Sequence, residues 1–143
     1  MTGLTKKAID KSKLMKMGNE FYKQGMTRQD ALKQAWALLK GSEVKVSGVT
    51  FGRRQEALHR LTWYNASDVS FTLERDLDNP YDRNAIAVVA AVAGKGNYVV
   101  GYLTAAVAKA LAPIIDKNIH LASRGRVIGG GAGFNYGLRL SVA

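Results

Sequence analysis

The chain of 143 residues contains no cysteine, and it has two prolines and two histidines. The absence of cysteine excludes disulfide bonds, a thiolate metal site and a cysteine nucleophile. His59 and His120 alone cannot supply a histidine-rich zinc site. We therefore expect no metal centre, and a reducing cytoplasm is the simplest compartment for this protein.

Long apolar runs are also missing. The apolar stretch Ala85–Ala93 has nine residues, far short of the roughly 20 that a bilayer-spanning helix needs. No apolar run follows the basic start of the chain, so we expect neither a membrane span nor a signal peptide. Apolar and aromatic residues nevertheless make up 47% of the sequence, enough for a buried core.

Acidic residues are scarce relative to basic ones, and the formal net charge is +10. Such an excess favours a polyanionic partner. Residues 1–41 hold nine basic and three acidic side chains, whereas residues 42–143 hold twelve and eight. This shift predicts two parts, a basic helical extension over 1–41 and a main domain over 42–143.

The first part has the apolar spacing of two helices. In residues 13–23 the apolar side chains fall mostly three and four positions apart. Thr27, with Asp30 three residues later, predicts the start of a second helix that Gly41 ends. The expected apolar seam of this helical hairpin consists of Leu14, Met15, Met17, Phe21, Tyr22, Ala31, Leu32, Ala35, Trp36, Leu38 and Leu39.

This hairpin has two interpretations. It docks on the main domain or on another protein, with Trp36 as a packing residue, or it is a helix-turn-helix DNA reader that turns Lys33 and Gln34 toward a groove. The second motif needs three packed helices, and the sequence indicates two. In either case we expect a solvated basic arm that consists of Lys6, Lys7, Lys11, Lys13 and Lys16.

After Gly41 the pattern changes to the alternation that is typical of strands. Thr104 is the expected N-cap of the clearer of two short helices. The order strand, helix, several strands, helix, two strands predicts an α+β fold, a small OB-like β-barrel of about six strands with two short helices, preceded by the helical hairpin. The expected strands cover 44–51, 69–73, 85–91, 98–102, 122–128 and 136–142, and the expected helices cover 55–61 and 104–116.

Three segments of the main domain resemble the HIRAN domain, which occurs at the N-terminus of the helicase-like transcription factor and in stand-alone bacterial and phage proteins. They are VSGVTFGRRQEAL at 46–58, LERDLDNPYDRNAIAV at 73–88, and VGYL at 100–103 followed by a helix that ends LAPIID at 111–116. The resemblance covers about residues 44–143. It implies an OB-like barrel that binds single-stranded DNA, with capture of a free 3′ end in the best-described members.

The resemblance also implies roles for particular residues. Phe51 and Tyr81 would stack on the terminal base from two sides. Asp82 would accept a hydrogen bond from the terminal 3′-hydroxyl, which explains a carboxylate in a groove that binds phosphates. Phe134 would be a second stacking aromatic, because it precedes the last strand.

Phosphate contacts form a further implied group. Tyr102 and the backbone that begins the helix at Thr104 would face a phosphate. The sequence departs from the family pattern at Thr50 and Ala105, where basic side chains are expected. Three nearby arginines would replace them, namely Arg53, Arg54 and Arg83.

Alternatives remain open for several of these residues. Residues 79–82 also read as a tight turn, Phe51 as core, and Arg54 as a partner of Glu56, Glu74 or Asp78. Trp63 and Tyr64 either cover the end of the barrel or add stacking surface. The run of glycines at 129–133 lacks the residues of a phosphate-binding loop and predicts a flexible hairpin, and we expect no cofactor.

The sequence therefore predicts a non-enzymatic, single-stranded DNA-binding module that recognises free 3′ ends in DNA replication, repair or end processing, with a single-strand/duplex junction as a related partner. One alternative is a protein-interaction adaptor that uses the hairpin. A second is a metal-dependent nucleic-acid-processing enzyme, for which Asp76, Asp78 and Asp82 are the local acidic residues. The sequence does not distinguish DNA from RNA.

Overall fold

A computed structural model describes residues 9–142. Lys6 and Lys7 of the expected basic arm lie outside this range. Within it, no helix has both the length and the apolar character that crossing a bilayer requires. The elements in chain order are α1 (Lys11–Lys23), α2 (Arg28–Leu39), β1 (Glu43–Ser47), α3 (Arg54–Leu61), the short 3-10 helix η1 (Ala66–Asp68), β2 (Val69–Arg75), β3 (Ile86–Val92), β4 (Gly96–Leu103), α4 (Ala105–Asp116), β5 (Ser123–Gly129) and β6 (Tyr136–Val142).

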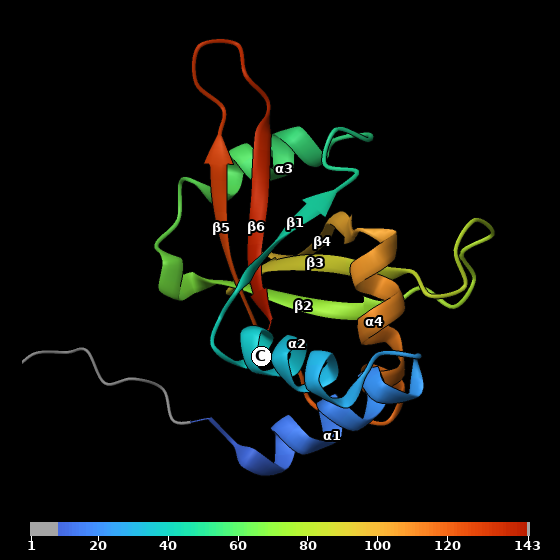
Figure 1. Cartoon of the computed structure of the whole chain (residues 1–143). Coiled ribbons are helices and arrows are strands. Elements are labelled where there is room, and N and C mark those ends of the chain that lie inside the picture. The colour runs from blue at the N-terminus through green and yellow to red at the C-terminus, as the bar shows by residue number, and fades with distance from the viewer. Residues whose placement is uncertain (1–8, 143) are drawn as a thin grey trace, which may run out of the picture.

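The strands form a closed antiparallel barrel in the order β1-β4-β3-β2-β5-β6 (Figure 1). The predicted α+β class, with a small six-stranded barrel, two short helices and a preceding helical pair, is confirmed. Alternate residues of each strand fill the barrel, since side chains point to opposite faces in turn. The fully buried side chains include Val46, Leu58, Ile86, Val88, Val100, Leu111, Leu138 and Leu140.

One bound of the predicted elements is wrong. The first strand ends at Ser47 and does not reach Phe51. Gly48 and Gly52 have φ values of 70° and 53°, a left-handed conformation that breaks a strand, so residues 48–53 form a turn into α3. Thr104 does stand at the N-cap position of α4, but its side chain makes no capping hydrogen bond.

Gly101 allows the paired strands β1 and β4 to approach each other closely. A Cβ atom at this position would lie 2.5 Å from Cγ1 of Val46 and 2.6 Å from the carbonyl oxygen of Ser47. Both distances are far below van der Waals contact, so only glycine fits. The pairing of Ser47 with Tyr102 depends on this close approach.

The second helix of the pair, α2, begins as predicted after Thr27, whose hydroxyl accepts a 3.1 Å hydrogen bond from the amide of Asp30. Its buried seam consists of Met17, Phe21, Ala31, Ala35, Leu38 and Leu39. The expected packing of Trp36 on the main domain is wrong, and its packing against another protein stays a prediction. This side chain is 43% exposed, and the ammonium of Lys40 lies 4.9 Å from its ring centroid. α1 packs against α2 and α4, and α2 also contacts β6. Four residues of the expected seam stay exposed and form what we call the outer stripe, namely Met15, Tyr22, Leu32 and Trp36.

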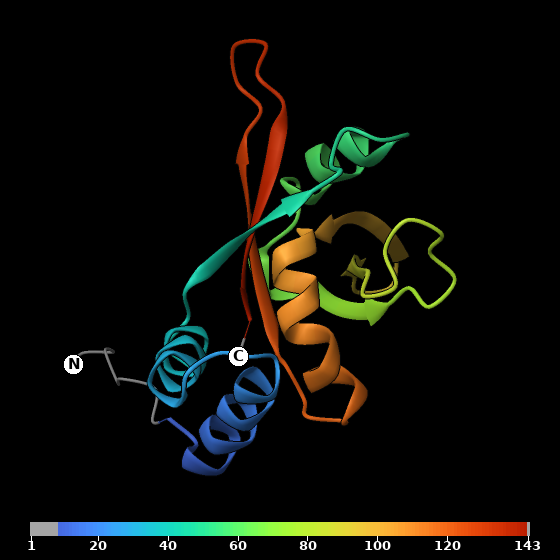
Figure 2. The same cartoon turned by 45° about the vertical axis from the view of Figure 1, so that its right-hand side comes forward.

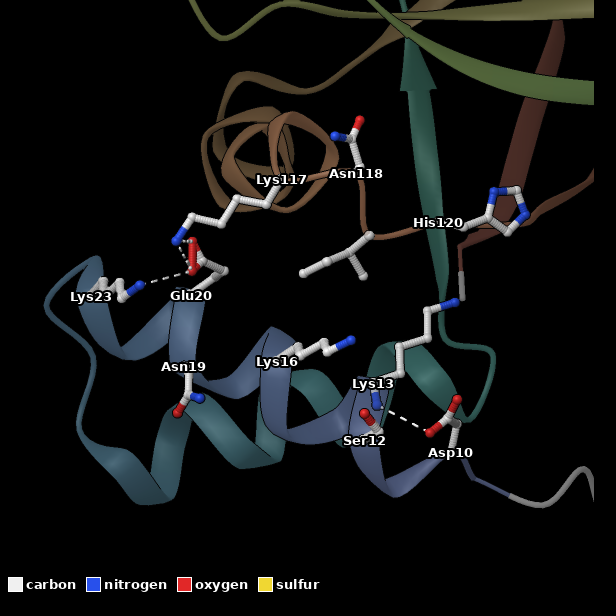
Figure 3. Close-up of a pocket in the computed structure, with 11 residues that line it drawn as sticks. Asp10, Ser12, Lys13, Lys16, Asn19, Glu20, Lys23, Lys117, Asn118 and His120 are labelled. Atoms are coloured by element: carbon white, nitrogen blue, oxygen red, sulfur yellow. Dashed lines mark hydrogen bonds and ion pairs between the residues drawn. The ribbon is translucent and has the colours of Figure 1, made fainter.

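The helical pair is fixed to the barrel beside the C-terminal end of α4 (Figures 2 and 3). The side chain of Gln24 donates a 3.0 Å hydrogen bond to the carbonyl of Ala110. The buried carboxylate of Glu20 lies 2.9 Å from Nζ of Lys117 and 3.4 Å from Nζ of Lys23. Residues of the pair and of the barrel belong to one buried cluster. The predicted division between residues 41 and 42 therefore stays a prediction.

These contacts also set the charge state of Glu20. Burial is the largest single influence and raises the pKa of this carboxyl. The hydrogen bonds and positive charges of Lys117 and Lys23 outweigh it and hold the pKa below the ordinary value of 4.5. Glu20 is thus ionised at neutral pH, although its residue is buried.

Candidate nucleic-acid interface

Three strands bring most of the predicted site residues, but not Phe134, to one end of the sheet. Tyr102 on β4 pairs with Ser47 of β1 on one side and with Ala87 of β3 on the other. The hydroxyl of Ser47 also donates a 3.1 Å hydrogen bond to the carbonyl of Tyr102. The loop of residues 76–85 joins β2 to β3 at this same end, so it lies beside Tyr102.

Arg54 lies over two aromatic rings of this site. Its guanidinium carbon is 5.7 Å from the ring centroid of Phe51 and 5.5 Å from that of Tyr102, within the range of cation–π attraction. Its Nη1 donates a 2.7 Å hydrogen bond to the carbonyl of Gly48. In the described part of the chain, Arg54 has no ion pair with Glu56, Glu74 or Asp78. Its charge is therefore held in place without a carboxylate partner.

Tyr102 has a partner that the sequence did not indicate. Its hydroxyl donates a 2.9 Å hydrogen bond to Oδ2 of Asp76. This bond is the main cause of a raised pKa of the Tyr102 hydroxyl, with burial and the negative charge of Asp76 adding to it. The expected phosphate contact of Tyr102 stays a prediction, and its hydroxyl is already engaged by a carboxylate.

Side-chain oxygens within the loop that carries Tyr81 and Asp82 accept hydrogen bonds from the backbone amides of that loop. Oδ1 of Asn79 accepts hydrogen bonds from the amides of Tyr81 and Asp82, at 2.9 and 3.0 Å. Oδ1 of Asp82 in turn accepts a 2.8 Å bond from the amide of Asn84. The turn interpretation is thus right for Asn79 and for one oxygen of Asp82. It gives no role to the Tyr81 ring, which is 95% exposed.

Arg75, which no sequence pattern indicated, stabilises the same loop through hydrogen bonds to its backbone. Its guanidinium donates to the carbonyls of Ala85 and Arg83, at 2.9 and 3.1 Å, and to Oδ1 of Asp116 at 3.0 Å. The bond to Asp116 links the loop to the end of α4. An arginine that ends an alternating strand before an acidic loop is a weak sequence signal, because most such side chains are solvated.

Gln55, also missed, ties the turn of residues 48–53 to β6. Its Nε2 donates to the carbonyls of Val49 and Tyr136, at 3.0 and 2.9 Å. Its Oε1 accepts a 2.7 Å bond from the amide of Tyr136. These three bonds use all but one of the four hydrogen bonds that a glutamine side chain commonly makes. They position Phe51, which is 70% exposed and therefore not a core residue.

Phe134 is not brought to the other aromatics. It lies in the connection between β5 and β6 and is 76% exposed. In Figures 1 and 2 the tip of this hairpin extends past α3, whereas the 76–85 loop projects beside α4. The stacking role of Phe134 stays a prediction.

The expected phosphate-binding groups are on the surface. The side chains of Arg53 and Arg83 are exposed. α4 begins at Ala105 directly after β4, with no acidic residue in its first turn. Backbone amides at such a helix start attract anions. Among residues 9–142, no group of three or more His, Cys, Asp or Glu side chains is arranged to hold a metal ion.

A basic hollow away from these residues lies where α1 meets the segment after α4, with a volume of about 580 Å³ (Figure 3). Its charged lining consists of Asp10, Lys13, Lys16, Glu20, Lys23 and Lys117. Lys23 and Lys117 are the partners of Glu20, so this ion pair accounts for part of the positive charge. The hollow lies beside the last turn of α4, at the other end of that helix from Thr104.

Comparisons with known proteins give one finding. A model of the HIRAN domain family matches residues 43–142. Curated proteins and solved structures give no match. The matched range starts with β1 and ends with β6, so it contains the whole barrel and all the site residues described above. The chain therefore belongs to the HIRAN domain family, a family of DNA-binding modules.

Proposed function

We propose that this protein is a non-enzymatic module that binds single-stranded DNA and recognises a free 3′ end. The observation that carries the proposal is the exposure of Phe51 and Tyr81, at 70% and 95%, on two loops at one end of the barrel. Neither ring contributes to the core. Base stacking on an exposed aromatic ring is worth about 1–3 kcal/mol per base and tolerates any sequence.

Phosphates are bound by cations and amides beside these rings. Arg54 is held between Gly48 and the two aromatic rings without a carboxylate partner, which supports a phosphate contact. Arg53, Arg83 and the backbone at Thr104 add to the positive field. Phe134 stacks on a further base of the same strand.

Asp82 recognises the terminal 3′-hydroxyl. Its Oδ1 caps the amide of Asn84, while its Oδ2 makes no hydrogen bond to the described residues and can accept one from a ligand. A phosphate at the same place would meet a carboxylate and be repelled. The carboxylate therefore favours a strand end over an internal position.

The biological setting follows from this ligand. A module that holds a free 3′ end acts in replication, repair or processing of DNA ends, and the family resemblance favours a bacterial or phage protein. The exposed lysines of α1 contact the duplex when the end lies at a single-strand/duplex junction, because basic helices add phosphate affinity without sequence preference.

Fluorescence anisotropy tests this proposal. A short single strand with a 3′-hydroxyl should bind more tightly than the same strand with a 3′-phosphate. Asp82→Asn is the matched variant, because it keeps the oxygen that caps Asn84 and removes the charge. It should abolish the preference while the protein stays folded. Equal binding of both ends by the wild type would contradict end recognition. Mg²⁺-dependent degradation of the strand would contradict the non-enzymatic part.

The outer stripe of the helical pair supports a second candidate, an adaptor that binds another protein. Tyr22 and Trp36 are 47% and 43% exposed, and cations lie 4.9 Å from each ring. Met15 and Leu32 continue this apolar stripe. A Leu32→Lys, Trp36→Lys double variant tests the candidate. The double variant should keep its DNA affinity. In a pull-down it should fail to retain a protein partner that the wild type binds specifically.

A further inference from the structure

One pocket of the barrel combines an apolar and aromatic lining with three cations. It lies between α3 and the β3–β4 hairpin and has a volume of about 320 Å³, within the usual range for small-ligand sites. The apolar part of its lining consists of Ala57, Leu61, Ala90, Val92 and Val100. Tyr64 and Tyr98 also line it and are 37% and 46% exposed. We call this site the α3–β4 pocket.

Three cations surround the α3–β4 pocket. Arg53, Arg60 and Lys95 line it together with a single carboxylate, that of Glu56. Arg60 pairs with Glu56 at 2.8 Å, whereas Arg53 and Lys95 have no ion pair within residues 9–142. An apolar and aromatic surface for a base, with cations at its rim for the phosphate, is the combination that nucleotides require.

The α3–β4 pocket adjoins a hollow that Arg54 of the proposed end-binding site lines. Arg54, which lies over Phe51 and Tyr102, lines a further hollow together with Glu74, Asn97 and Tyr98. Asn97 and Tyr98 line the α3–β4 pocket as well. Arg53 adds a direct link, because it precedes Arg54 in the chain and lines the pocket. A strand that leaves the rings of Phe51 and Tyr81 can therefore pass Arg54 and reach the pocket at Tyr98, although the carboxylate of Glu74 also lines the hollow between them.

We propose that the α3–β4 pocket binds a nucleotide of the same single strand, upstream of its 3′-terminal nucleotide, with the base on Tyr98 and Tyr64. This inference rests on the proposed function, because it takes the strand end to be held at Phe51, Tyr81 and Asp82. It assigns Tyr64 to the stacking surface. It also gives Arg53 and Lys95 phosphates as partners.

The test is anisotropy with 3′-hydroxyl strands of increasing length. Barrels of this kind cover about 4–16 nucleotides, so strands of about three and about ten nucleotides compare the end site alone with both sites. The wild type should bind the longer strand more tightly. Tyr98→Ala should weaken binding of the longer strand by about fivefold or more and leave the shorter strand unchanged. Tyr98→Phe keeps the ring and should behave as the wild type.

A charge variant gives an independent measurement. Lys95→Glu should weaken the longer strand selectively, and Lys33→Glu, an exposed lysine of α2 outside the pocket, is the matched control with the same charge change. Equal effects of Tyr98→Ala on both lengths, or no gain with length in the wild type, would overturn the pocket proposal and leave the end site standing. Competition by a free deoxynucleoside monophosphate that depends on Tyr98, without any gain with strand length, would also overturn it. Failure of the proposed function would give a different result. The wild type would then bind strands with a 3′-hydroxyl and with a 3′-phosphate equally well at both lengths.

Discussion

The hydroxyl of Tyr102 donates a 2.9 Å hydrogen bond to Oδ2 of Asp76, and this bond joins β4 to the loop between β2 and β3. Asn79 donates a second, 3.3 Å bond to the same oxygen. Asn79 also caps the amides of Tyr81 and Asp82. The position of the proposed end-binding residues therefore depends on a chain of polar contacts that begins at Tyr102.

Tyr102→Phe should separate this positioning from stacking. The variant keeps the ring beneath Arg54 and removes the bond to Asp76. We expect the free energy of unfolding to fall by about 1 kcal/mol and the preference for a 3′-hydroxyl over a 3′-phosphate to decrease. Urea unfolding and anisotropy measure the two effects. Unchanged stability and unchanged preference would show that the loop is held without this bond.

Tyr81→Ala should affect binding and not folding. The ring is 95% exposed, so its removal should change stability by less than about 0.5 kcal/mol. Loss of a stacked base should weaken binding of a short strand by about 1–3 kcal/mol. Tyr22→Ala on α1 removes an exposed tyrosine outside the barrel and serves as the control. An affinity equal to that of the wild type would remove Tyr81 from the site.

Affinity for single strands should fall steeply as salt increases. Contacts from Arg53, Arg54 and Arg83 to three phosphates predict a slope of about −2 in log K against log salt, at about −0.7 per phosphate. Arg54→Gln should reduce the steepness by about 0.7. A titration series between low and physiological salt measures both slopes. A flat response in the wild type would contradict an electrostatic contribution.

Glu20 predicts loss of stability in acid. Its pKa is held below 4.5 in the folded state, so its contribution is fully present above the pKa of the unfolded chain and is lost as pH falls through the folded pKa. Glu20→Gln should lower stability at pH 7 by about 1–3 kcal/mol. The variant should then lose less stability than the wild type on acidification. Parallel stability curves for the two proteins would refute this role of Glu20.

Gly101→Ala should disrupt the close pairing of β1 with β4. The added methyl would lie 2.5 Å from Val46 and 2.6 Å from Ser47, and overpacking of this kind costs about 1–3 kcal/mol or more. Gly131→Ala is the matched control, because its Cβ would meet no atom within 4 Å. Thermal unfolding of the two variants should differ clearly. Similar melting temperatures would contradict the close approach.

Much of the fold could be predicted because it depends on local patterns. The hydroxyl of Thr27 and the amide of Asp30 are three residues apart, and alternation over residues 136–142 is complete within one strand. Trp36 shows the limit of such patterns. Its spacing is that of a buried helix position, yet whether a helix face is covered depends on what packs against it, and nothing in the described structure covers this one.

The candidate site divides in the same way. Phe51, Tyr81 and Asp82 could be proposed from the sequence, because they stand in short motifs whose resemblance to a family is visible without coordinates. Arg75 and Gln55 could not be proposed. Arg75 acts mainly through backbone carbonyls, and Gln55 acts through backbone carbonyls and an amide. Every residue has such groups, so no sequence pattern indicates these partners.

By itself, the sequence determined the order of the elements, the barrel class and the family, since periodicity and motifs are properties of contiguous residues. Only the tertiary structure decided that Tyr102 meets Asp76, 26 residues away, and that Gln55 meets Tyr136, 81 residues away. It also decided that Tyr98 and Tyr64 line one pocket. These contacts arise when the barrel closes, because closure fixes which distant strands, turns and loops become neighbours.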